Sequence, residues 1–185
     1  MPIKRPPQPT EEGLWPVTVT FLEMREKAAT PAPPPPAMSH AVIRAEAPTL
    51  SFYRFLYNTT GRDWGWMDRR NMSDVELDRI INAAATEIYV LYLRGVPAGF
   101  AEINTEDMPD VIDLAYFGIL PEFIGMGLGP WLLDNIVDLA WSKGPARLTV
   151  NTCTLDHPKA LLMYQHAGFK PIRQRHIEIE PLPDL

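Results

Sequence analysis

The residues best suited to bind an anion form a glycine-rich run in the middle of the chain. Gly125, Gly127 and Gly129 alternate with other residues and open directly onto an apolar-periodic segment typical of a helix. Glycine lets the backbone approach a ligand closely, and successive N–H groups at a helix N-terminus attract negative charge. The run therefore predicts a cradle for a phosphate or pyrophosphate group, with a purely structural turn as the alternative.

Two familiar phosphate-binding motifs do not fit this run. A P-loop needs Lys followed by Ser or Thr after its last glycine, and no Lys follows these glycines. The dinucleotide-binding fingerprint needs G-x-G-x-x-G, which three glycines in strict alternation do not match. The ligand is thus neither a P-loop nucleotide nor a dinucleotide held in the usual way.

The elements that must position this run are predicted from hydrophobic periodicity and cap residues. The segments typical of strands are 17–22, 40–45, 87–93, 98–104, 111–119, 147–151 and 169–179. Helices are expected after Thr49, after the Ser73–Glu76 capping box, near Gly129 and after Asp156 as a cap. The apolar faces expected on the first three helices are Phe52, Phe55 and Leu56; Leu77, Ile80, Ile81 and Ala84; and Leu133, Ile136, Val137 and Ala140. This order indicates a mixed α/β sheet.

A second segment, downstream of the glycines, strengthens the ligand-binding interpretation. His157 precedes Ala160 and Tyr164 in the pattern His-x-x-Ala-x-x-x-Tyr, and Gly168 and Phe169 follow. Together with the glycine run, this pattern resembles the GNAT superfamily of acetyl-CoA-dependent N-acetyltransferases over about residues 40–180. The resemblance implies a mostly antiparallel twisted sheet with one parallel strand–helix–strand unit for the cofactor and helices on both faces.

The resemblance also implies how acetyl-CoA is held. Backbone amides of the glycine run would bind its phosphates, the backbone of residues 117–119 would pair with the pantetheine arm, and the Ile119 N–H would meet the oxyanion. The chain departs from the family at two positions, Ile124 for the usual Gln or Arg and His157 for the usual Asn. The implied cofactor-binding residues are Phe117, Gly118, Ile119, Ile124, Gly125, Met126, Gly127, Leu128, Gly129, Pro130, His157 and Tyr164.

Acetyl transfer to an amine needs a proton acceptor for the ammonium group and a proton donor for the leaving thiolate. The resemblance assigns the donor role to Tyr164, for which a structural aromatic is the alternative. Asp113 matches the general-base position of some family members, and strand alternation predicts that it shares a face with Phe117. A solvated acid at the start of a strand is its alternative. Glu102, in the middle of a strand, is the second candidate base, either aimed into a site or exposed at an edge.

Three further residues are candidates for binding the acceptor. Trp64 and Trp66 lie between the first two helices, where they could floor a pocket or cage a cationic amine, or fill the core under a loop. Asn151, at the end of a strand, either contacts a ligand or terminates the strand. The acceptor implied by the family is a small-molecule or peptide amine.

Cys153 and the histidines are given no catalytic or metal role. Direct attack needs no acyl-enzyme, so Cys153 is interpreted as a small buried packing residue. Of the histidines, only His157 lies beside the proposed site, and the others lack the spacing of metal ligands. The sequence therefore predicts no metal.

Length and composition limit the remaining possibilities. The chain has 185 residues, 46% hydrophobic and 22% charged, which is typical of one globular domain. A net charge of −6 argues against a non-specific nucleic-acid partner. No apolar run reaches the about 20 residues of a membrane helix, and the first residues lack the apolar core of a secretory signal. We expect a cytoplasmic protein with no membrane partner, either a monomer or a homodimer.

The first part of the chain is the least interpretable. Residues 1–38 are expected to precede a domain over 39–185 and to hold a possible strand at 17–22, whose pairing the sequence does not assign. Residues 31–36 are rich in proline and favour polyproline II, either as a stiff surface spacer or as the ligand of a proline-binding partner.

The sequence thus predicts an N-acetyltransferase that transfers an acetyl group from acetyl-CoA to a primary amine by direct attack. A non-catalytic acyl-CoA-binding sensor or scaffold of the same fold is the first alternative. An interaction protein that recruits a partner through its proline-rich segment is the second.

Overall fold

The computed structural model describes residues 7–27, 29 and 31–180 of the chain. Over these residues seven strands form one sheet in the order β2-β3-β4-β5-β6-β1-β7. The strands are β1 Trp15–Met24, β2 His40–Arg44, β3 Thr86–Leu93, β4 Val96–Asn104, β5 Val111–Ile119, β6 Arg147–Cys153 and β7 Lys170–Ile179. The α-helices are α1 Leu50–Gly61, α2 Asp74–Ile81, α3 Leu128–Trp141 and α4 Ala160–His166, and short 3-10 turns are η1 Arg62–Trp64 and η2 Pro121–Phe123.

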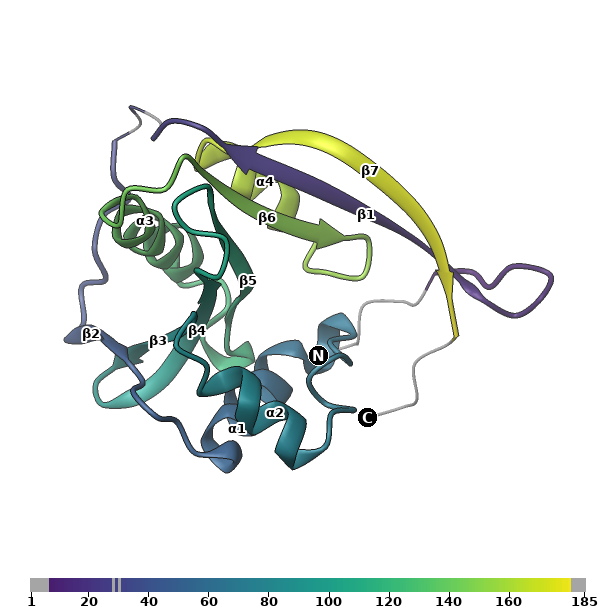
Figure 1. Cartoon of the computed structure of the whole chain (residues 1–185), viewed down its shortest axis with the longest axis horizontal. Coiled ribbons are helices and arrows are strands. Elements are labelled where there is room, and N and C mark those ends of the chain that lie inside the picture. The colour runs from purple at the N-terminus through teal and green to yellow at the C-terminus, as the bar shows by residue number, and fades with distance from the viewer. Residues whose placement is uncertain (1–6, 28, 30, 181–185) are drawn as a thin grey trace.

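The predicted fold class is confirmed. Neighbouring strands are antiparallel except β5 and β6, which run parallel and are joined through α3. Helices cover both faces of the sheet, α1 and α2 on one side and α3 and α4 on the other (Figure 1). No helix within the described ranges is long and apolar enough to cross a membrane.

Local cap signals predict two helix starts correctly and a third wrongly. The Thr49 hydroxyl accepts a hydrogen bond from the Phe52 N–H, and Ser73 and Glu76 form the full capping box. The sequence predicts Asp156 as the cap of the fourth helix, but α4 begins after Lys159 and has no side-chain cap. The carboxylate of Asp156 instead accepts hydrogen bonds from the end of β6, which is described below.

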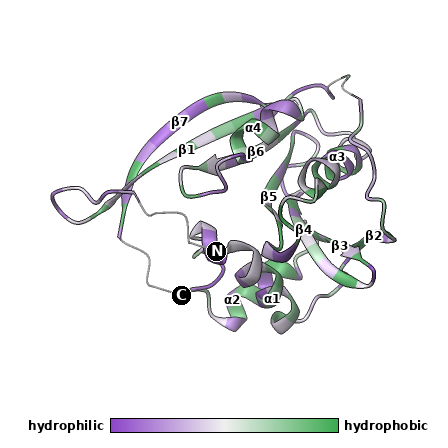
Figure 2. Cartoon of the chain, turned by 180° about the vertical axis from the view of Figure 1, so that it is seen from behind, coloured by the Kyte–Doolittle hydropathy of each residue, from purple (hydrophilic) through white to green (hydrophobic). Residues whose placement is uncertain are grey.

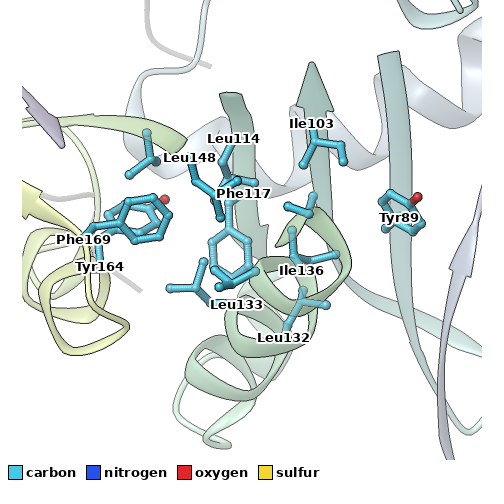
Figure 3. Close-up of a cluster of buried hydrophobic side chains, with 14 of the residues drawn as sticks. Tyr89, Ile103, Leu114, Phe117, Leu132, Leu133, Ile136, Leu148, Tyr164 and Phe169 are labelled. Atoms are coloured by element: carbon cyan, nitrogen blue, oxygen red, sulfur yellow. The ribbon is translucent and has the colours of Figure 1, made fainter. Parts of the chain in front are cut away.

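Two buried clusters fill the space between the sheet and its helices. The larger contains residues of α3, α4 and the middle strands, and the aromatic rings of Phe117, Tyr164 and Phe169 lie together in it (Figure 3). All four residues expected on the apolar face of α3 are buried. The expected face of α1 is partly wrong, because Phe55 is 45% exposed while Tyr53 takes its place in the second cluster.

The face expected for the second helix also needs correction. Leu77 and Ile81 are buried as expected, whereas α2 ends at Ile81. Ala84, expected on the same apolar face, is therefore beyond the helix and exposed. The cap residue Asn82 closes the helix with its backbone N–H before the pattern is complete.

Strands β5 and β6 pair over only part of their lengths. Their register ends at Leu114 and Val150, yet both strands continue, β5 to Ile119 and β6 to Cys153. The two strands therefore diverge toward their carboxyl ends, as Figure 1 shows. This divergence opens the sheet at the place where the sequence predicts the cofactor.

An irregularity in β5 changes which side chains share a face. The register with β4 shifts after Glu102, so that Ala115 lies outside the regular pairing. Leu114 and Phe117, three positions apart, consequently belong to the same buried cluster. The expectation that Asp113 shares a face with Phe117 is wrong, because the irregularity reverses the alternation between them.

Strand β1 extends further than the sequence predicts and lies inside the sheet. It pairs with β6 on one side and β7 on the other, with Val19 opposite both Cys153 and Arg175. Beyond β1, β7 forms an edge of the sheet, and its exposed residues are largely hydrophilic (Figure 2). The domain boundary at residue 38 stays a prediction, for which a deletion is described below.

Candidate active site

One cavity of about 1010 Å³ lies where β5 and β6 diverge. We call the part of its lining that the glycine run and α4 form the glycine-loop end. The aromatic end is the part formed by Tyr57, Trp66, Asp68, Tyr116 and Asp156. The predicted site residues that line it are Trp64, Trp66, Phe117, Gly118, Ile119, Ile124, Gly125, Gly127, Leu128, Gly129, Pro130, Asn151, His157 and Tyr164. Met126, Asp113 and Glu102, all within the described residues, do not line it.

The glycine-loop end presents backbone rather than charged side chains. Gly125 and Gly127 have φ angles of 90° and 75°, which strain any other residue. Gly127 is also the N-cap of α3 and supplies no side-chain cap. The first N–H groups of α3 therefore remain available to an anion. Ile124, 42% exposed, adds only an apolar contact to this end.

Gly129 lies close to a side chain of α4. A Cβ atom at this position would lie 3.2 Å from the sulfur of Met163 on α4. A larger residue would require the flexible Met163 side chain to shift. The members of the glycine run thus differ, since two of them adopt positive φ angles and the third lies close to a side chain of α4.

Tyr164 lines the cavity and is 6% exposed. Its ring contacts those of Phe117 and Phe169, with centroids 6.3 and 6.1 Å away (Figure 3). Burial raises the pKa of its hydroxyl, and the negative charges of Asp156 and Asp113 raise it further. The phenol therefore stays protonated at neutral pH and can donate a hydrogen bond, although the raised pKa makes it a weaker acid than an ordinary tyrosine.

Asp113 lies just before the divergence of β5 and β6. It is paired with Thr149, whose hydroxyl donates to the carboxylate at 2.5 Å. Burial raises the pKa of Asp113, although the hydrogen bond from Thr149 opposes this effect. A carboxyl with a raised pKa is a better proton acceptor near neutral pH than an ordinary one. The Asp113 side chain does not line the cavity, however.

Glu102 is 1% exposed and is engaged in a buried network. Its carboxylate accepts a hydrogen bond from the Tyr53 hydroxyl. It also forms an ion pair with Arg69, whose guanidinium nitrogen lies 2.6 Å from a carboxylate oxygen. The Arg69 guanidinium also lies over the Tyr116 ring, 5.2 Å from its centroid. Glu102 is therefore neither at an exposed edge nor directed into the cavity, the two alternatives that the sequence leaves open.

The aromatic end contains side chains that sequence reasoning missed. The rings of Tyr57, Trp66 and Tyr116 contact one another, with centroids 5.0 to 5.3 Å apart. The carboxylates of Asp68 and Asp156 line the same cavity. The only sequence signal for Asp68 is its place in the tryptophan-rich stretch, and Tyr116 gives no signal beyond the general β-propensity of its strand.

Asp156 has a different role from the helix cap that the sequence predicts. Its carboxylate accepts hydrogen bonds from the Thr152 hydroxyl at 2.7 Å and the Cys153 N–H at 2.8 Å. It also accepts one from the Trp66 indole N–H at 3.3 Å. Cys153 itself is half-buried and lines the cavity, whereas the sequence predicts a buried packing residue. Asp156 thus connects the end of β6 with the aromatic end.

The proline-rich segment also reaches this cavity. Pro31 and Pro33, predicted to belong to a spacer, are among the residues that line it. Over the described parts of the chain, no three His, Cys, Asp or Glu side chains are grouped as metal ligands.

Comparison with known proteins gives a clear match to one family. The model described as the acetyltransferase (GNAT) family matches residues 53–169, more than half of the chain. No curated protein matches the sequence.

Solved structures match at low sequence identity. A protein of unknown function from Staphylococcus epidermidis has a TM-score of 0.64 at 17% identity, and the match covers 93% of this chain but only 65% of that protein. Aminoglycoside N-acetyltransferase AAC(6')-Iy in complex with CoA has a TM-score of 0.55 at 18% identity, covering 75% and 93%. The soil-metagenome aminoglycoside acetyltransferase meta-AAC0020 with sisomicin gives 0.57 at 13%, covering 70% and 87%. These matches show a common fold.

Proposed function

Since the chain belongs to the GNAT acetyltransferase family, we propose that it transfers an acetyl group from acetyl-CoA to a primary amine by direct attack. One observation carries this proposal. The divergence of β5 and β6 opens a single cavity that joins the glycine run, Tyr164 and an aromatic end with two carboxylates. A cofactor arm and an amine that enter from opposite ends would meet beside Tyr164.

The residues at the glycine-loop end fit the phosphates of acetyl-CoA. The positive φ angles of Gly125 and Gly127 turn the chain so that the first amides of α3 face an anion. These amides replace the side-chain contact that Ile124 does not provide. Phe117, Gly118 and Ile119 belong to the part of β5 beyond its pairing with β6. Their backbone is therefore suited to pair with the pantetheine arm.

The reaction forms a bond from nitrogen to the acetyl carbon and breaks the bond from that carbon to sulfur. In this proposal the Ile119 N–H, the position that the family resemblance implies, stabilises the negative charge that develops on the acetyl oxygen. Tyr164 is the proposed proton donor to the departing sulfur. Burial keeps its phenol protonated, but the raised pKa makes full proton transfer uphill, so a hydrogen bond from the phenol stabilises the sulfur as it leaves. The ammonium form of the acceptor must lose one proton before it attacks.

That proton goes to Asp113 or Glu102 in our proposal, through water in either case, because neither carboxylate lines the cavity. Asp113 is the better candidate, since its pKa is raised by burial and it lies at the base of the divergence. The carboxylate oxygens of Glu102 are already engaged by Arg69 and by the Tyr53 hydroxyl. Because neither carboxylate lines the cavity, the alternative of a non-catalytic acyl-CoA-binding protein is also favoured.

Calorimetric titration with acetyl-CoA, with CoA and NADH as comparisons, tests the cofactor part of the proposal. We expect micromolar binding of acetyl-CoA and no binding of NADH. A screen of primary amines that follows release of the CoA thiol then tests transfer. Binding without release in any mixture would support the acyl-CoA sensor instead, and no binding at millimolar acetyl-CoA would reject both.

A further inference from the structure

One buried hydroxyl in the wall of the cavity has no hydrogen-bond partner within the described structure. Thr60 is 1% exposed and lines the cavity, and its Oγ1 is the unpartnered atom. The described residues contain three other buried side-chain atoms of this kind, in Asn58, Arg69 and Arg70, and none of these three residues lines the cavity. A buried hydroxyl without a partner is costly. Because Thr60 lines the cavity, a bound ligand can supply the missing partner.

Thr60 lies against the last part of β5, on the face of the sheet that α1 covers. A Cβ atom at Gly118 would lie 2.3 Å from the Thr60 methyl group, so Thr60 packs directly against the backbone of the strand. Ile119, the next residue, points to the opposite face, where a Cβ atom at Gly129 of α3 would lie 3.9 Å from its side chain. Side chains of α1 and the start of α3 therefore approach the same short stretch of β5 from opposite faces.

The backbone of this stretch directs one N–H group into the opening of the sheet. The Leu120 N–H donates to the Ala98 carbonyl of β4 at 2.9 Å. Neighbouring residues of a strand direct their N–H groups to opposite sides, so the Ile119 N–H points away from β4. On that side β5 is no longer paired with β6, since their register ends at Leu114. A strand N–H and the Thr60 hydroxyl therefore lie near each other where the sheet opens.

We propose that Thr60 is a second hydrogen-bond donor to the carbonyl oxygen of the acyl group, beside the Ile119 N–H. The carbonyl oxygen of acetyl-CoA lies in the opening between β5 and β6 and accepts from both groups. Two donors fixed around that oxygen stabilise the charge that develops on it during attack, and Thr60 keeps its own proton throughout. The inference rests on the acetyl-CoA binding of the proposed function, but it does not depend on the identity of the amine.

A pair of substitutions separates the hydroxyl from the rest of the side chain. Thr60→Val removes the hydroxyl and keeps the branched shape, whereas Thr60→Ser keeps the hydroxyl. We expect kcat for acetyl transfer to fall about 100-fold in Thr60→Val and to stay within about threefold of wild type in Thr60→Ser. The unfolding temperature of Thr60→Val should equal or exceed that of wild type, because the substitution removes an unpaired buried hydroxyl. Activity and stability should therefore change independently.

Asn58→Leu is the matched control. Asn58 belongs to the same helix and also has an unpartnered buried oxygen, but it does not line the cavity. This variant should keep the kcat of the wild-type protein. Equal losses of kcat in Asn58→Leu and Thr60→Val would assign Thr60 to the packing of α1 and would overturn the inference.

A spectroscopic measurement separates failure of the inference from failure of the proposed function. Acetyl-CoA labelled with ¹³C at the acetyl carbonyl is bound to each protein without an amine, and the NMR shift of the labelled carbon is recorded. A hydrogen bond to the oxygen moves this resonance downfield. We therefore expect the resonance to lie further downfield in wild type and Thr60→Ser than in Thr60→Val.

The combined outcomes decide between the two proposals. If the labelled carbon has the same shift in all three proteins, or if Thr60→Val retains its kcat, the inference is overturned and acetyl transfer stands. If no amine is acetylated but the shift follows the hydroxyl, Thr60 binds the acyl oxygen and the proposed transfer falls. If acetyl-CoA does not bind at all, both are overturned.

Discussion

The two ends of the cavity are built in different ways. The glycine-loop end comes from one continuous stretch of chain and presents backbone amides, whose placement depends on φ angles at Gly125 and Gly127. The aromatic end gathers side chains from α1, η1, β5 and the segment after β6. A ligand common to a family can be met by backbone alone, whereas the individual ligand of one protein needs side chains. The comparison therefore predicts different sensitivities to mutation at the two ends.

The largest effect is expected from the strand that supports both ends. Deletion of residues 1–38 removes β1 from between β6 and β7, together with the buried side chains of Val17, Leu22 and Met24. Each such burial is worth about 1.5–3 kcal/mol, so their loss is comparable with the about 5–15 kcal/mol that stabilises a domain. We expect the deleted protein to lack a cooperative thermal transition in circular dichroism.

Deletion of residues 1–9 is the control, because it ends before β1. A shortened chain 39–185 that melts cooperatively and binds acetyl-CoA would establish the domain boundary predicted at residue 38. It would also mean that the pairing of β1 contributes little to either end of the cavity.

The next largest effect is expected at Tyr164, the proposed proton donor that lines the cavity. Tyr164→Phe removes the proton donor but keeps the ring between Phe117 and Phe169. We expect kcat to fall about 100-fold, while calorimetry gives an unaltered Kd for acetyl-CoA. Loss of CoA binding as well would assign Tyr164 a mainly structural role.

A smaller effect should separate backbone from side chain within the glycine-loop end. Gly127→Val places a β-branched residue at a φ of 75°, a strain of about 1–3 kcal/mol. Relief of that strain moves the amides, so Kd for acetyl-CoA should rise about tenfold. Met126→Ala, next to it in the loop, changes an exposed side chain that does not line the cavity, and its Kd should remain within about twofold of wild type. Similar effects of the two substitutions would contradict the comparison.

The smallest effect concerns pH. Burial raises the pKa of Asp113 in the folded protein above the ordinary value of 3.8 that it has in the unfolded chain. At a pH between the ordinary and the raised pKa, the folded protein therefore binds more protons than the unfolded one. The free energy of unfolding therefore falls as the pH rises through this window. Asp113→Asn should remove that fall in urea unfolding measured across the acid range. If Asp113 is also the proton acceptor, the variant loses turnover, and the rise of kcat/KM with pH that its ionisation causes disappears.

The sequence predicts best what depends on neighbouring residues. The caps Thr49 and Ser73 act within three residues, and the apolar face of α3 repeats regularly, so both are confirmed. The prediction for Asp156 is wrong because a carboxylate can accept hydrogen bonds from residues before it in the chain as well as from residues after it. The cap pattern considers only the helix ahead, whereas the donors Thr152 and Cys153 lie behind.

The rest depends on contacts between distant segments. The irregularity of β5 at Ala115 arises from its register with β4, which no local pattern records. The aromatic end is assembled from separate elements. In the sequence Tyr57 and Tyr116 are typical core residues, and only the structure shows that their rings contact each other. The glycine run was recognisable because its members are adjacent, although the roles of the residues around it stay predictions.

The place of β1 in the sheet also governs the order in which the protein is made and folded. The Thr18 N–H donates to the Thr154 hydroxyl across 136 residues of chain. During synthesis β1 emerges well before its neighbours β6 and β7. Contacts between residues far apart in the sequence slow folding. Until its neighbours are available, an unpaired strand is also exposed to aggregation. The pairings of β1 thus form only after its two neighbouring strands have followed it from the ribosome.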